Sequence, residues 1–135
     1  MTVGRSTSPT HQVGQKAEEA ALVFLQNQGF QLVSENFHCR MGEIDLIMVK
    51  DQLLIFVEVR LRKSSVFGNA VTSITPSKQR KIIQTSVVFL QAFPEYESHD
   101  CRFDVIAIEN SKRSAGKNML IDWIKGAFDA EMFYE

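Results

Sequence analysis

The stretch Gly42–Arg60, with the sequence GEIDLIMVKDQLLIFVEVR, decides the fold of this chain. It holds two runs rich in β-branched and aliphatic residues, at 42–49 and 53–60, separated by a short polar segment. This is the pattern of a β-hairpin. Both runs are apolar on both faces, so we expect the sheet that contains them to be covered on each side.

Further elements are predicted on either side of this hairpin. Apolar residues at helical spacing predict a helix from Val13 to Gln28, and Gly29 then occupies the position where helices often end in a left-handed residue. A strand is expected over 30–37. Thr75 followed by Pro76 resembles an N-cap with proline in the first helical position, and the helix that they begin should end before Pro94.

The rest of the chain adds a loop and two strands to this pattern. The loop is expected over 61–75, and the strands over 102–108 and 119–124, the last at an edge of the sheet. The order α-β-β-β-α-β-β predicts an α/β fold, a mixed sheet flanked by helices.

The composition is that of one soluble domain. The chain has 135 residues, of which 44% are hydrophobic and 23% charged. We assign residues 1–12 to a disordered leader, because they lack periodicity, and residues 13–135 to one domain. No signal peptide and no apolar run of about 20 residues is present, and two cysteines fit a reducing compartment. We therefore expect a cytoplasmic protein outside the membrane.

Any contact with a polyanion must come from local clusters, because the net charge is only −1. Basic residues gather at 60–63, at 78–81 and at 112–117. For each cluster taken alone, the alternative is a solvated charged surface. The candidate nucleic-acid contacts are Arg60, Arg62, Lys78 and Lys81.

Two carboxylates interrupt the apolar runs of the hairpin. If Asp51 and Gln52 form a two-residue turn, Asp45 lies directly opposite Glu58, with Cβ atoms about 4.5–5.5 Å apart. A hard divalent cation such as Mg²⁺ or Mn²⁺ would relieve the repulsion, since it prefers carboxylate oxygens. The alternatives are that these carboxylates reach solvent, or that Arg60 or Arg102 pairs with one of them.

Several motifs in order resemble the bacterial YraN-like family. They are GEIDLI at 42–47, FVEVR at 56–60, Phe67-Gly68, the helix start Ser77-Lys78 and RFDV at 102–105. The resemblance spans about Gly14 to Phe128. It implies membership of the PD-(D/E)XK superfamily, whose fold is a restriction-endonuclease-like three-layer α/β/α structure with a central mixed sheet, near the Holliday-junction resolvases.

The resemblance also implies roles for particular residues. Asp45 and Glu58 match the two acidic positions of the PD-(D/E)XK motif, and Glu18 matches a helical glutamate that completes the metal site in the resolvase branch. The alternative for Glu18 is a surface glutamate favoured by the dipole at a helix start. Resolvases act as symmetric dimers, so the resemblance makes a homodimer an expectation.

One position departs from the superfamily pattern. Arg60 stands where lysine is usual, and a guanidinium is a poor general base because it does not lose its proton. Lys78 is in the first turn of its helix, where a bound phosphate would compensate the unfavourable positive charge. The alternative is that its side chain extends into water.

Two functions follow from these expectations. The first is a metal-dependent nuclease acting on DNA, including branched or structured DNA, with Asp45, Glu58 and Arg60 as catalytic residues and Mg²⁺ or Mn²⁺ bound by Glu18, Asp45 and Glu58. The second is a non-catalytic nucleic-acid-binding or interaction module that retains the nuclease fold. Loss of cleavage without loss of binding on substitution of Asp45 separates the two.

Overall fold

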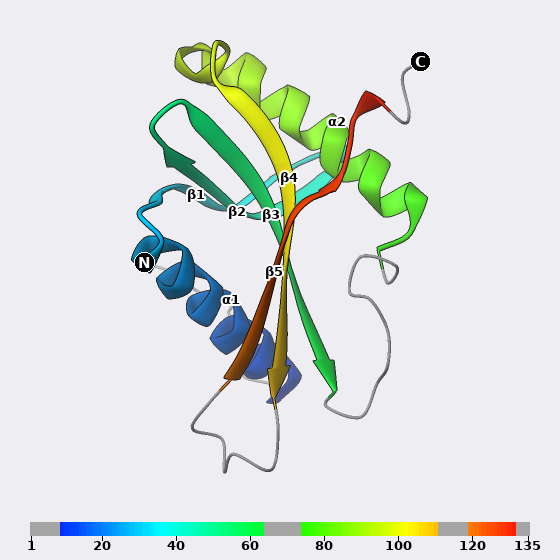
Figure 1. The fold of residues 1–135 in the computed structure, drawn as a ribbon. Helices are drawn as coiled ribbons and strands as arrows, with labels where there is room; N and C mark the ends of the chain where they lie inside the picture. Colours follow the sequence, from blue (N-terminus) through cyan, green and yellow to red (C-terminus); the bar gives the residue numbers. More distant parts are fainter. Residues whose placement is uncertain (1–8, 64–73, 111–118, 132–135) are drawn as a thin grey trace, which may run out of the picture.

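The fold is a mixed β-sheet with one long helix on each face (Figure 1). The structure is a computed structural model that describes residues 9–63, 74–110 and 119–131. Its helices are α1 (Pro9–Asn27) and α2 (Pro76–Ala92), with a 3₁₀ turn at Pro94–Tyr96. Its strands are β1 (Gln31–Cys39), β2 (Gly42–Lys50), β3 (Leu53–Lys63), β4 (Asp100–Asn110) and β5 (Met119–Phe128). The predicted α/β fold with a mixed sheet is confirmed.

The five strands lie in the order β1-β2-β3-β4-β5. Neighbours are antiparallel except for β3 and β4, which run parallel along their whole length. A parallel pair needs a long crossover, and α2 lies within it. The central strand β3 is therefore hydrogen-bonded on both sides, while β5 lies at an edge, as predicted.

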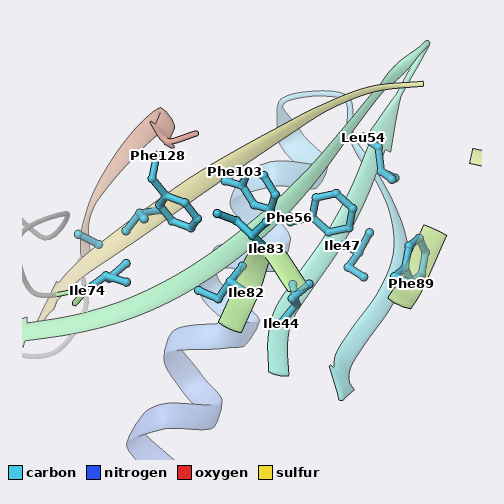
Figure 2. Close-up of a cluster of buried hydrophobic side chains, with 12 residues drawn as sticks. Ile44, Ile47, Leu54, Phe56, Ile74, Ile82, Ile83, Phe89, Phe103 and Phe128 are labelled. Carbon is cyan, nitrogen blue, oxygen red and sulfur yellow. The ribbon is translucent and has the colours of Figure 1, made fainter. Parts of the chain in front are cut away.

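Each helix buries an apolar face against its own side of the sheet. Ala17, Ala21 and Leu25 of α1 pack with residues of β2, β3 and β4 on one face. On the opposite face, α2 covers a second cluster in which Phe89 meets Phe56 with ring centroids 6.0 Å apart (Figure 2). The sheet is thus covered on both sides, which explains why its central strands are apolar on both faces.

The helix ends follow the predicted signals with one exception. Thr75 caps α2 by accepting a hydrogen bond from the Lys78 N–H at 3.1 Å, and α2 ends before Pro94. Gly29 ends α1 in the left-handed region, with φ of 94°. The start of α1, however, is Pro9 and not Val13, so residues 9–12 of the predicted leader are helical; residues 1–8 lie outside the described residues. Proline's fixed φ suits a first helical turn, and a polar turn needs no apolar periodicity to be helical.

Several strands extend beyond their predicted ranges, β4 by two residues at each end. β3 continues to Lys63, through the start of the expected loop, because its pairing with β4 extends to Asn110. β5 continues to Phe128, whose ring stacks on Phe103 at 5.2 Å. Most of the expected loop, residues 64–73, lies outside the described residues.

Neither of the two long helices in the described part of the chain combines the length and the apolar character that a bilayer crossing requires.

Candidate functional site

The hairpin register brings Asp45 and Glu58 together. Pairs from Lys50–Leu53 to Leu46–Val57 are those expected for a two-residue turn at Asp51 and Gln52. The ladder stops one pair before Asp45 and Glu58. There the Asp45 side chain replaces a backbone partner, and its Oδ2 accepts a hydrogen bond from the Val59 N–H at 2.8 Å.

Asp45 lies where the regular alternation of β2 breaks. Ile44 and Ile47 both pack under α2, whereas Leu46 and Met48 pack under α1. Strict alternation would place Ile44 and Ile47 on opposite faces. The alternation therefore changes between Ile44 and Leu46, and the Asp45 carboxyl between them interacts with Glu58 of β3 and Glu18 of α1.

The environment of Asp45 strongly disfavours its charged form. Burial, followed by the negative charge of Glu58, raises the pKa of Asp45 to about 8. The hydrogen bond from Val59 opposes this shift, while the charge of Glu18 and a hydrogen bond with the Glu58 carboxyl add to it. Two acidic side chains thus share a confined space, and Asp45 holds its proton at neutral pH when no cation is present.

Glu58 is buried and contacts two cationic side chains. Lys78 Nζ lies 2.8 Å from Glu58 Oε2, and the Arg60 guanidinium lies 3.6 Å from the same oxygen. Arg60 is two residues from Glu58 on β3, whereas Lys78 comes from the first turn of α2. Pairing of Arg60 with one of the two carboxylates was an alternative raised by the sequence. It occurs at Glu58, which also remains close to Asp45.

A cleft of about 320 Å³ opens over this carboxylate pair. The start of β2, the middle of β3 and the first turns of α2 form its walls. Its lining residues are Gly42, Glu43, Asp45, Glu58, Thr75, Ser77, Lys78, Lys81 and Ile82. Carboxylates thus lie at the floor of the cleft and lysines along the wall formed by α2.

Glu18 lies near this pair but has a different partner. It is in the middle of α1 and not in its first turn, so the helix dipole does not account for it. Burial raises the pKa of Glu18, against a hydrogen bond from the Asn36 side chain that lowers it; Glu43, Glu35 and Glu58 raise it further. Asn36 has a left-handed backbone, with φ of 53°, at the point where β1 faces Asp45.

The donor set of the cleft fits a hard divalent cation held by two carboxylates. Within the described ranges, no three His, Cys, Asp or Glu side chains come together closely enough to share a metal ion. The predicted third ligand, Glu18, interacts electrostatically with both Asp45 and Glu58. Mg²⁺ commonly binds through one or two carboxylates and completes its shell with water and phosphate oxygens, which is compatible with Asp45 and Glu58 alone.

The predicted nucleic-acid contacts fall into two groups. Lys78 and Lys81 line the cleft, whereas Arg60 and Arg62 are not among its lining residues. Arg62 lies 3.9 Å from Asp122 of β5, and Arg60 contacts the cleft through Glu58. The lysines of α2 are thus closer to the candidate site than the arginines of β3.

Sequence reasoning assigned no role in the site to three residues that shape it. A side chain at Gly42 would come within 3.1 Å of Thr85 Oγ1 and 3.3 Å of Lys81 Cβ, so glycine permits α2 to pack over the start of β2. Ser77 lines the cleft, and Asn36 holds Glu18. A glycine before the first acidic residue was a visible signal for the close approach, but nothing in the sequence marks Asn36.

Fold and site together define a class, an α/β protein with a mixed five-stranded sheet and a carboxylate pair in a lysine-walled cleft. Residues 17–108 match the model of the family described as Uncharacterised protein family UPF0102. The chain belongs to this family, so the family-level resemblance is confirmed.

Similar proteins share nearly the whole chain. A UPF0102 protein of Pseudomonas savastanoi pv. phaseolicola is 44% identical over 123 residues, covering 91% of this chain and 98% of that protein. A UPF0102 protein of Alcanivorax borkumensis is 42% identical over 118 residues, covering 87% of this chain and 92% of its own. One from Nitrosococcus oceani has the same identity and coverage.

Proposed function

We propose that this chain is a metal-dependent nuclease that acts on DNA phosphodiesters. The observation that carries the proposal is the placement of Asp45 and Glu58 on the floor of a cleft whose wall presents Lys78 and Lys81. A metal-dependent nuclease needs carboxylates that bind the cation and nearby cationic groups that bind the phosphate. The assignment to the PD-(D/E)XK, restriction-endonuclease-like class belongs to this proposal and rests on the motifs at 42–47 and 56–60.

Each residue has a role in this proposal. Asp45 and Glu58 would hold Mg²⁺ or Mn²⁺, an ion that supplies an activated water and stabilises charge on the phosphodiester. The Val59 N–H orients the Asp45 carboxyl toward the cleft. Lys78 and Lys81 attract the phosphate, and Arg60 pairs with Glu58 and helps to position it. Glu18 adds negative charge nearby, held by Asn36.

The second candidate is a nucleic-acid-binding module without turnover. Arg60 favours it, because the residue two positions after Glu58 is a guanidinium that cannot act as a base. In that case the cleft would bind the backbone of DNA through Lys78 and Lys81, and binding would depend on salt and not on metal. A preference for branched or structured DNA rests on the resemblance to resolvases and is part of the first proposal.

The test is cleavage of labelled single-stranded, duplex, flap and four-way-junction DNA in Mn²⁺, Mg²⁺ and EDTA. Asp45→Asn keeps an acceptor for the Val59 N–H but removes the ionisable group. Asp51→Asn is the matched control, because Asp51 is an exposed turn residue of the same hairpin and asparagine tolerates its φ of 53°.

The expected result is cleavage that EDTA abolishes, that Asp51→Asn retains and that Asp45→Asn lowers by at least about 100-fold, with the DNA affinity measured in EDTA maintained. Salt-sensitive binding of DNA without cleavage in any metal would favour the binding module. If the folded parent chain shows no binding and no cleavage of DNA, both functions are rejected.

A further inference from the structure

Lys78 is the closer of the two cationic side chains that contact the Glu58 carboxylate. Its Nζ lies 2.8 Å from Oε2, closer than the Arg60 guanidinium at 3.6 Å. The Glu58 side chain is only 6% exposed, whereas that of Lys78 is 45% exposed. A buried carboxylate requires a partner. In the protein without a metal ion, Lys78 provides the closer of the two.

The attachment of Lys78 allows its ammonium group to move while its backbone stays fixed. The Lys78 N–H is tied to Thr75 Oγ1 at 3.1 Å, within the cap of α2. The side chain beyond it is a flexible four-carbon stem that is partly exposed to solvent. Arg60, in contrast, lies on the same strand as Glu58 and does not line the cleft.

From this geometry, and on the basis of the proposed function, we propose that Lys78 is an internal counter-cation that leaves Glu58 when a divalent metal ion binds and then contacts the substrate phosphate. The ammonium and the metal ion compete for the same carboxylate oxygen. A phosphate in the cleft attracts Lys78 away from Glu58 and so favours the metal ion. Metal binding and DNA binding therefore strengthen each other, and by linkage the effect is the same in both directions.

The competing explanation is that Lys78 only stabilises the fold by neutralising Glu58. The two explanations predict different effects on metal affinity. If Lys78 competes with the metal ion, its removal tightens metal binding. If it only supports the fold, its removal lowers the melting temperature and leaves metal affinity no better than before.

Lys81 offers a matched control. It lines the same cleft and lies one turn further along α2, but none of the ion pairs among the described side chains joins it to Glu58. Lys81→Met therefore removes the same charge from the same wall without removing the contact. Lys78→Met and Lys78→Gln test the contact itself, with two side chains that differ in polarity.

The first experiment measures Mn²⁺ binding to the full chain by the EPR signal of the unbound ion. Lys78→Met and Lys78→Gln are expected to bind Mn²⁺ about tenfold more tightly than the parent, since a unit charge near the carboxylate is removed. Lys81→Met is expected to stay within about threefold of the parent, as fits a screened charge at the cleft rim.

The second experiment measures the affinity for a labelled DNA duplex by fluorescence anisotropy in Ca²⁺ and in EDTA. Ca²⁺ is a hard cation that also prefers carboxylate oxygens. The parent is expected to bind DNA more tightly with Ca²⁺ than in EDTA, and the Lys78 variants are expected to lose most of this gain.

The outcomes separate this inference from the proposed function. Mn²⁺ affinities of the Lys78 variants no higher than that of Lys81→Met would overturn the inference. If the parent binds Mn²⁺ and Asp45→Asn does not, the proposed metal site is retained even though the inference about Lys78 is rejected. Absence of Mn²⁺ binding by every variant and by the parent would overturn both.

Discussion

The Asp45 carboxyl group is buried, lies near the Glu58 carboxylate and accepts one hydrogen bond from the Val59 backbone N–H. The pKa of Asp45 is raised to about 8, mainly by burial and then by Glu58. In the unfolded chain an aspartate has a pKa of about 3.9. Between these values the folded protein binds one more proton than the unfolded chain. Its free energy of unfolding therefore falls as the pH rises through this window.

Asp45→Asn removes this proton uptake and should change the pH dependence of stability. We expect the variant to gain stability relative to the parent as the pH rises from 5 to 8, with the smallest difference at pH 5. Urea unfolding at several pH values in EDTA measures this, and every other titratable group is shared by the two proteins. Parallel stability curves for both would show that Asp45 is ionised in the folded state.

Among the elements, α2 carries the cationic wall of the cleft, and its position depends on the cap. Thr75 accepts the Lys78 N–H, and Pro76 follows in the first turn. Thr75→Ala removes the acceptor and should lower the free energy of unfolding by about 1 kcal/mol. Thr75→Ser retains the hydroxyl and should stay close to the parent in urea unfolding. Equal stability of the alanine and serine variants would contradict a capping role.

A second element-scale feature is the junction of β4 and β5, which Asp104 holds together. Its fully buried carboxylate accepts hydrogen bonds from Arg102 Nε and Nη2 at 2.8 Å each, from Trp123 Nε1 at 2.9 Å and from the Gly126 N–H at 3.0 Å. The Trp123 ring packs edge-on against Phe24 of α1, with centroids 5.7 Å apart. Asp104 thus connects the edge strand to the α1 side of the core.

Asp104→Asn leaves the partly buried Arg102 without its carboxylate and replaces an acceptor with a second donor. We expect a loss of about 3 kcal/mol in the free energy of unfolding. Asp122→Asn is the control on β5, since Asp122 is 61% exposed and its pair with Arg62 is long; its loss should stay within about 0.5 kcal/mol. Denaturant unfolding of both variants decides this, and similar losses would contradict the role assigned to Asp104.

On the scale of the whole molecule, lysines lie on both sides of the sheet in a chain whose net charge is −1. The cleft on the α2 side presents Lys78 and Lys81, whereas Lys125 lies on the α1 side with Nζ 4.3 Å from the centroid of the Trp123 ring. Under the proposed function, nucleic acid would contact Lys78 and Lys81 at the cleft and not Lys125. A near-neutral protein can bind a polyanion in this way because electrostatic interactions are local at physiological salt.

This distribution predicts which lysine affects the salt dependence of DNA binding. Lys81→Met should reduce the slope of log affinity against log salt by about 0.9, whereas Lys125→Met should leave the slope unchanged. Fluorescence anisotropy of a labelled duplex across a salt series measures both. An equal effect of the two substitutions would show that DNA does not bind at the cleft.

Local patterns in the sequence predicted most of the architecture. Apolar runs and the turn at Asp51 and Gln52 predicted the hairpin with its observed register, and Thr75-Pro76 predicted the start of α2. These features depend on neighbours a few residues apart, so they can be recognised without the fold. The ends of β3 and β5 were predicted too short because their extension depends on pairing with β4, which is distant in the sequence.

The sequence by itself determined the elements, the mixed sheet and the proximity of Asp45 and Glu58, because each depends on local pattern or hairpin geometry. Only the tertiary structure decided which cation meets Glu58 most closely. Lys78 is 20 residues further along the chain than Glu58, and α2 brings it to 2.8 Å by packing over Gly42. The hydrogen bond between the side chains of Glu18 and Asn36 also became apparent only in the tertiary structure. Such contacts are set by how helices pack on a sheet, which spacing along the chain does not encode.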